Sequence, residues 1–144
     1  MDTEESIREL KKQLYSLINS NLMSIDEIKK INKTGVYAIY ENEKNKPAYI
    51  GKSKKRDIKV RMRELTVNFQ SHTFNKKILN QIFNVSTQKL KELDKEKRKK
   101  LQHKANEYIK RNFRIRFIHI PYNGKEIERS EHFAIGVENP EFND

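Results

Sequence analysis

The chain has 144 residues, a length typical of one domain with its own hydrophobic core. It contains no cysteine, which excludes disulfides and thiolate zinc sites. No apolar run approaches the roughly 20 residues of a membrane span, and the first residues lack the pattern of a signal peptide. We therefore expect no membrane association, and a cytoplasmic location by default.

Positive charge is concentrated in the middle of the chain. The formal net charge is +11, and residues 35–120 carry 23 basic against 8 acidic side chains, whereas the two ends are neutral or acidic. A surface that tracks a phosphate backbone requires this distribution, so nucleic acid is the favoured partner. The alternative is a basic surface that serves solubility or binds an acidic protein.

The first 33 residues predict a helical extension. Apolar side chains recur at helical spacing over residues 4–19, and Ser24 with Glu27 forms a capping box that begins a second, short helix. No linker rich in proline or glycine follows. We therefore expect an extension (1–33) packed on a domain over residues 34–144, with a homodimer surface as another use of these helices.

Residues 34–40 and 47–50 predict the two antiparallel strands of a hairpin. Both segments are rich in β-branched and aromatic residues, and the polar residues 41–46 form the turn between them. In this pairing Tyr37 and Tyr49 lie near each other on one face. Tyrosine is common in strands, so packing is the simpler explanation for the pair.

The rest of the chain alternates between predicted helices and one more strand. Helices are expected over 57–69 and 73–83, a long basic helix over 87–111 within an insertion at 86–112, a strand over 113–120, and a last helix over 126–137. This order predicts an α+β domain with a small three-stranded antiparallel sheet flanked by helices.

Two charged residues occupy apolar positions of predicted helices. Arg61 falls within the stripe of Ile58 and Leu65, and Glu131 falls within the stripe of the last helix. An unpaired buried charge costs several kcal/mol, so each side chain should meet a partner, a metal or a substrate. An Arg61–Glu131 ion pair is the structural alternative to a functional role.

The segments Gly35-Val36-Tyr37 and Tyr49-Ile50-Gly51, with eleven residues between the tyrosines, resemble the two motifs of the GIY-YIG nuclease family. This family includes homing endonucleases, restriction enzymes and the nuclease module of UvrC. Its catalytic arginine, glutamate and asparagine correspond in order to Arg61, Glu131 and Asn143, the last within Pro140-Glu141-Phe142-Asn143.

The resemblance implies a metal-dependent DNA endonuclease that hydrolyses phosphodiester bonds. Glu131 would hold Mg²⁺ or Mn²⁺, and Arg61 would clamp the scissile phosphate. Tyr37 is expected to position or deprotonate the attacking water and Tyr49 to bind the water or the phosphate, although these roles could be exchanged. Lys52 is expected to contact the phosphate, and the alternative is an ordinary surface lysine. A non-catalytic nucleic-acid-binding module of the same fold is the alternative.

One position departs from the family pattern. Many members carry histidine or tyrosine four residues after the arginine, where this chain has Leu65. His72 is expected to take that role, with a helix cap or a surface position as the alternative. Asn143 has the alternative of a C-terminal cap or a frayed tail.

Further basic residues are expected to contact the DNA backbone, because successive helical turns offer a ladder of cations. A solvated helix face is the alternative for those in the insertion. The expected contacts are Lys54, Lys55, Arg56, Arg63, Lys97, Arg98, Lys99 and Lys100.

Overall fold

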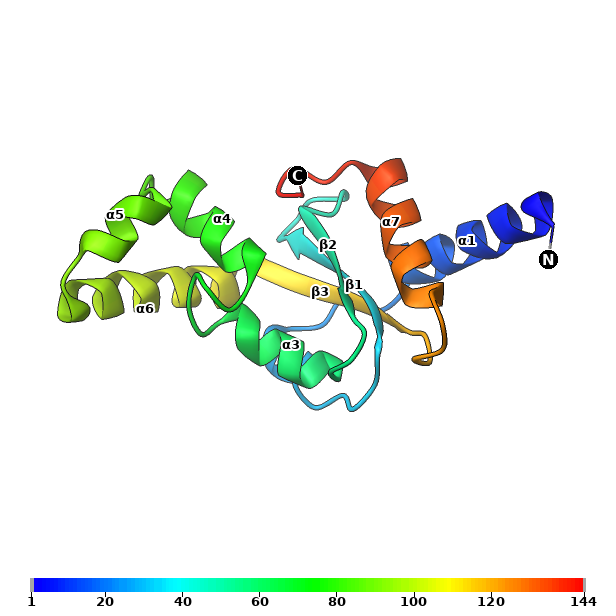
Figure 1. Ribbon diagram of the computed structural model, residues 1–144, viewed down its shortest axis with the longest axis horizontal. Helices are drawn as coiled ribbons and strands as arrows, with labels where there is room; N and C mark the ends of the chain where they lie inside the picture. The colour runs from blue at the N-terminus through cyan, green and yellow to red at the C-terminus, as the bar shows by residue number, and fades with distance from the viewer. Residues whose placement is uncertain (1, 144) are drawn as a thin grey trace.

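A computed structural model describes residues 2–143 as an α+β fold around a three-stranded antiparallel sheet (Figure 1). The strands are β1 (Gly35–Glu41), β2 (Tyr49–Ser53) and β3 (Phe113–His119), in the order β2-β1-β3. The predicted fold class is therefore confirmed.

Helices cover both faces of the sheet. α1 and α7 pack on one face, while α2, α3, α4 and α6 supply the core of the other. None of the helices in residues 2–143 combines the length and the apolar character needed to cross a bilayer. The helices are α1 (Thr3–Ile18), α2 (Ile25–Ile28), α3 (Ile58–Leu65), α4 (Thr73–Gln81), α5 (Thr87–Glu92), α6 (Lys95–Asn112) and α7 (Glu126–Glu138).

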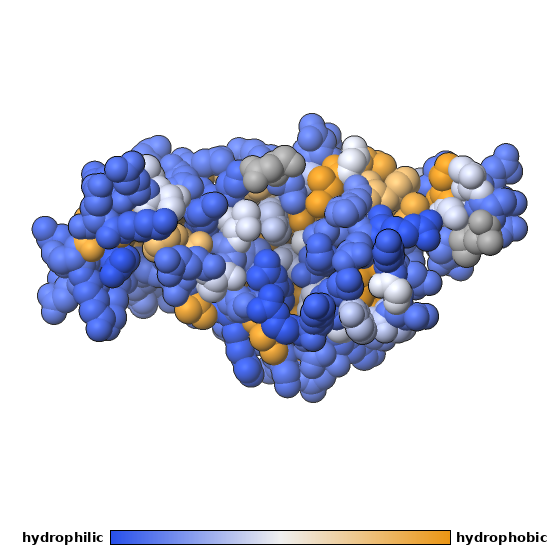
Figure 2. Space-filling view, viewed as in Figure 1, coloured by the Kyte–Doolittle hydropathy of each residue, from blue (hydrophilic) through white to orange (hydrophobic). Residues whose placement is uncertain are grey.

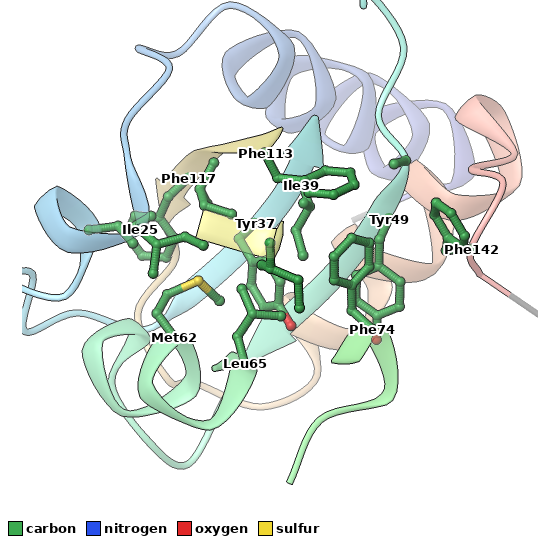
Figure 3. Close-up of a cluster of buried hydrophobic side chains, with 14 of the residues drawn as sticks. Ile25, Tyr37, Ile39, Tyr49, Met62, Leu65, Phe74, Phe113, Phe117 and Phe142 are labelled. Carbon is green, nitrogen blue, oxygen red and sulfur yellow. The ribbon is translucent and has the colours of Figure 1, made fainter. Parts of the chain in front are cut away.

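Strand alternation decides which side chains enter which core. Ile39 pairs with Tyr49 and Tyr37 pairs with Gly51, so both tyrosines lie on one face of the sheet, as predicted. This face packs against α3 and α4. Figure 3 shows Tyr37 between the sheet and the α3 side chains Met62 and Leu65. The opposite face carries Val36, Ala38, Tyr40 and Ile50, which pack against α1 and α7.

Both outer strands are capped by other parts of the chain. On β3, the backbone of Met23 exchanges two hydrogen bonds of 2.8 Å with Ile115, which ties the N-terminal extension to the sheet. On β2, the C-terminal tail bonds to Ala48 and Ile50. The backbone groups bonded in this way are not available for pairing with another chain.

The helix expected over 57–69 is shorter than predicted. α3 ends at Leu65, and the Asn68 side chain accepts hydrogen bonds from the backbone N–H groups of Gln70 (2.8 Å) and Ser71 (3.1 Å). This side-chain turn competes with the helix for the same backbone. Phe69 nevertheless remains buried, in a small cluster with Leu79.

The prediction of one long basic helix over 87–111 is wrong, because the structure has two helices there. Leu93 is extended (φ −67°, ψ 145°), and the Asp94 side chain caps α6 by accepting from Lys97 N–H at 2.9 Å. An N-terminal aspartate cap begins a new helix rather than continuing one. The buried face of α6 carries Gln102 and Ala105.

Candidate active site at the edge of strand β2

A polar cleft of about 690 Å³ opens where β2 ends. Its walls come from β2 and the residues that follow it, from α3 and from α7. The cleft is lined by Tyr49, Lys52, Ser53, Lys54, Lys55, Arg56, Arg61, Glu128 and Glu131.

Residues from opposite faces of the sheet meet in this cleft because β2 is an outer strand. Tyr49 faces the same side as α3, which supplies Arg61. Lys52 is three residues further along β2, so it faces α7, which supplies Glu131. The structure thus brings together four of the predicted catalytic residues, which span 82 positions of the sequence from Tyr49 to Glu131.

Tyr37 lies behind the cleft and is completely buried. Its ring centroid is 6.4 Å from that of Tyr49, and its hydroxyl oxygen is 2.7 Å from Nε2 of His72. The ring also lies against Gly51: a Cβ atom there would be 2.4 Å from the Tyr37 hydroxyl oxygen. Gly51, the glycine of the second motif, therefore provides the space that the ring of Tyr37 in the first motif fills.

His72 is the N-cap of α4 and is also buried. Its Nδ1 accepts a hydrogen bond from the Phe74 backbone N–H at 3.0 Å. Burial, followed by the charges of Arg61 and Arg56, lowers the pKa of His72 well below its ordinary value, so the ring is neutral at pH 7. Since Nδ1 is an acceptor, the proton lies on Nε2, which donates to the Tyr37 oxygen.

The titration of Tyr37 runs against its expected role as a base. Burial raises the pKa of Tyr37 far above its ordinary value, and Tyr49 adds to the increase. The charge and the hydrogen bond of Arg61 lower the same pKa, but they do not overcome burial. Tyr49 lines the cleft directly, so it is the tyrosine placed to meet a water molecule or a phosphate.

Arg61 reaches the cleft from its half-buried position on α3. Its guanidinium is 3.5 Å from the Glu64 carboxylate and donates to the Ser71 carbonyl oxygen at 3.3 Å. Among the described residues it pairs with Glu64 and not with Glu131, so the Arg61–Glu131 ion pair does not form. Glu64 also binds Arg56 at 2.5 Å.

Two carboxylates project from α7 into the cleft, and each meets a lysine. Glu131 is only 8% exposed and lies 3.3 Å from Lys52 Nζ, while Glu128, one turn earlier, lies 2.5 Å from Lys54 Nζ. The hydrogen bond from Lys54 lowers the pKa of Glu128. Each carboxylate therefore has a lysine ammonium beside it in the cleft.

The expected metal ion would find few protein ligands in the cleft. Within residues 2–143, no group of three or more histidine and acidic side chains is arranged to hold a metal ion. Glu131 nevertheless offers a hard oxygen donor in a polar cleft, which suits an ion that keeps several water ligands. The donor set fits one Mg²⁺ or Mn²⁺ held by Glu131 and does not fit a protein cage around the ion.

Asn143 lies outside the cleft lining and bonds to the backbone of β2. Its Oδ1 accepts from the Ile50 N–H at 2.8 Å and its Nδ2 donates to the Ile50 carbonyl at 2.9 Å. Beside it, Phe142 is buried against Phe74. The tail is therefore anchored rather than frayed, and Asn143 holds the strand that carries Tyr49.

The predicted DNA contacts divide among several surfaces. Lys54, Lys55 and Arg56 line the cleft, and Arg63 is exposed on α3. In α6, Arg98 and Lys99 line a second groove, whereas Lys97 is 3.9 Å from Asp94. Lys100 is exposed outside both linings.

Three features of the cleft were missed in the sequence. Glu64 is three residues after Arg61 and Glu128 is three residues before Glu131, a spacing that places side chains on one helix face. This spacing could have identified both carboxylates. The contact between Gly51 and Tyr37 depends on the strand register and has no separate signal.

Comparison of this chain with protein-family models, with curated proteins and with solved structures found no match.

Proposed function

We propose that this protein is a metal-dependent DNA endonuclease of the GIY-YIG type. The observation that supports it most strongly is that Tyr49, Lys52, Arg61 and Glu131 line one cleft. These are the residue types that phosphodiester hydrolysis requires: a hydroxyl near the water, cations for the phosphoryl oxygens, and a carboxylate for a metal.

In the proposed reaction, water attacks phosphorus and the bond to the 3′ oxygen breaks, with a proton passing to that oxygen. Arg61 binds the non-bridging oxygens of the scissile phosphate, and Lys52 adds a second cation. The Tyr49 hydroxyl orients the water, while the buried Tyr37 and His72 hold Tyr49 in place. Glu131 would hold a divalent ion, which would supply Lewis acidity at the phosphate.

A second candidate, a non-catalytic nucleic-acid-binding module, is favoured by one specific observation. Lys52, Lys54, Arg56 and Arg61 all lie beside carboxylates of the protein, so four of the five cations that line the cleft already have a carboxylate partner. Such a cleft would have to exchange these ion pairs for phosphate before it could act as an enzyme.

The deciding experiment incubates the protein with supercoiled plasmid in Mg²⁺, Mn²⁺ or EDTA. The proposal expects nicking or linearisation with metal and none in EDTA. Glu131→Gln should abolish cleavage while DNA affinity is largely kept, and Glu126→Gln, on the same helix but outside the cleft lining, is the matched control. Cleavage by Glu131→Gln at the wild-type rate would remove Glu131 from the mechanism, and no cleavage by the wild type would favour the binding module.

DNA as the partner and a cytoplasmic location belong to the same proposal. The homodimer remains a prediction, for which an apolar groove between α1 and α7 is the surface to test. Figure 2 shows apolar side chains at this junction, and the exposed Tyr15 and Val137 line the groove.

A further inference from the structure

A second groove, of about 470 Å³, lies between α6 and the segment that joins α3 to α4. Figure 1 shows α6 beside this segment, away from β2 and α7. Three cations of α6, Lys95, Arg98 and Lys99, line the groove together with His103, and no carboxylate does. The spacing of these four residues places them on one face of the helix.

The charge state of this groove differs from that of the cleft. In the part of the chain that the structure describes, Lys95, Arg98 and Lys99 form no ion pair with a carboxylate, while four cations of the cleft do. The outward-facing Lys97 has Asp94 beside it. The groove therefore holds three cations without a carboxylate partner among the described residues, and these are available to an external anion.

The floor of the groove is a rigid network of amides. Gln102 Oε1 accepts from the Phe69 backbone N–H at 2.9 Å, and its Nε2 donates to Asn75 Oδ1 at 2.8 Å. Asn106 completes the network by donating to the Val67 carbonyl at 3.2 Å. These bonds fasten the segment to α6, so the width of the groove does not depend on surface side chains alone.

The lining also indicates which part of a nucleic acid would bind. Proteins that hold single strands present exposed aromatic rings on which bases stack. Phe69 is only 7% exposed, which leaves the imidazole of His103 as a single exposed ring and no row of rings on which successive bases could stack. Cations without a stacking platform suit the phosphate backbone of a duplex and carry no base readout.

We propose that the α6 groove, defined by Lys95, Arg98 and Lys99, is a sequence-independent binding site for the phosphate backbone of duplex DNA, separate from the cleft. The choice of DNA as the polyanion rests on the proposed function. Binding in the groove itself requires no catalysis.

The same segment connects the two sites. Its Ser71 carbonyl accepts from Arg61, and the next residue, His72, donates to Tyr37. A duplex in the groove would thus lie against the segment that positions Arg61 and His72.

The test measures binding of a 30-base-pair duplex in EDTA over a range of salt concentrations, by fluorescence anisotropy. The groove variant Lys95→Gln/Arg98→Gln/Lys99→Gln is compared with a control of equal charge on the same helix, Lys97→Gln/Lys100→Gln/Lys104→Gln. Each lost phosphate contact removes about 0.9 from the slope of log affinity against log salt. We expect the groove variant to lose about 2 to 3 in slope and more than about 10-fold in affinity at low salt, and the control to lose less than half as much.

Equal losses in the two variants would overturn the proposal, because they would indicate a diffuse basic face. An unchanged slope in the groove variant, or no salt-dependent binding by the wild type, would also overturn it. If either triple variant fails to fold by circular dichroism, Arg98→Gln and Lys97→Gln form the single-site comparison, with an expected slope loss of about 0.9 only in the former. If the salt slope falls only in the groove variant and the wild type does not cleave plasmid, the groove proposal is supported and the nuclease proposal is rejected. If the wild type cleaves plasmid and the salt slopes do not change, the nuclease proposal is supported and the groove proposal is rejected.

Discussion

Replacing Gly51 by alanine tests the packing behind the cleft most directly. The added Cβ would lie 2.4 Å from the hydroxyl oxygen and 2.5 Å from Cζ of Tyr37, so the ring must retreat by about 1 Å to reach ordinary contact. Tyr37 is completely buried, and its hydroxyl is already bonded to His72. The ring therefore cannot move without disturbing the core or that hydrogen bond.

The expected cost follows from these two contributions. Overpacking a core costs about 1–3 kcal/mol, and losing a buried hydrogen bond costs about 1–3 kcal/mol more. We expect Gly51→Ala to lower the free energy of unfolding by about 2–6 kcal/mol, measured by urea denaturation. Gly136→Ala is the matched control: it is exposed in α7, its Cβ meets nothing within 4 Å, and it should stabilise by about 0.5–1 kcal/mol.

A double-mutant cycle separates this clash from a general strand effect. Tyr37→Leu removes the ring atoms that the new methyl group would meet. In that background, Gly51→Ala should cost at least about 1 kcal/mol less than in the wild type, because coupled neighbours are not additive. An equal cost in both backgrounds, or a loss below about 0.5 kcal/mol in the wild type, would refute the argument.

Three further predictions concern the site. Tyr49→Phe should slow cleavage about 100-fold or more if the Tyr49 hydroxyl takes part in proton transfer. Near-normal cleavage rates in both Tyr49→Phe and Tyr37→Phe would show that the two tyrosines serve packing alone. Glu64→Gln should raise duplex affinity several-fold in EDTA at low salt, because it frees Arg61, and unchanged affinity would show that Glu64 does not compete with phosphate. The pKa of His72 is lower in the folded state than in the unfolded state. The contribution of the neutral ring to the free energy of unfolding is therefore complete above about pH 6.5 and falls as the pH drops toward the folded-state pKa. Urea denaturation at pH 7.5 and 5.5 should therefore show a smaller loss for His72→Phe than for the wild type, and equal losses would contradict the buried neutral ring.

The sheet could be predicted because alternation and turn position determine its register. The pairing of Ile39 with Tyr49 follows from the polar turn between the first two strands, and the alternation of β3 also appears in the sequence. The break before Asp94 was missed because the basic residues on both sides favour helix. The decisive interaction there is one capping hydrogen bond, which local composition does not reveal.

The site could be predicted only in part, for a physical reason. Arg61 and Glu131 are recognisable because each places a charge in an apolar stripe. The contact between His72 and Tyr37 joins residues 35 positions apart, and the cap of α4 that orients the imidazole exists only in the fold. Asn143 likewise finds Ile50 across 93 positions, so its anchoring role has no local signal.

Under the two proposals, the cleft and the α6 groove would divide the work of binding DNA by their charge balance. In the cleft, a phosphate must displace Glu64 from Arg61, and Glu131 must give up Lys52, so binding there exchanges one ion pair for another and adds little net affinity. In the α6 groove, unpaired cations release counterions from the DNA without losing a carboxylate partner, so the gain is larger. Under the two proposals, the groove supplies affinity without sequence preference. The cleft then binds a phosphate only where its carboxylates are occupied by other cations, which couples phosphate binding in the cleft to metal binding at Glu131.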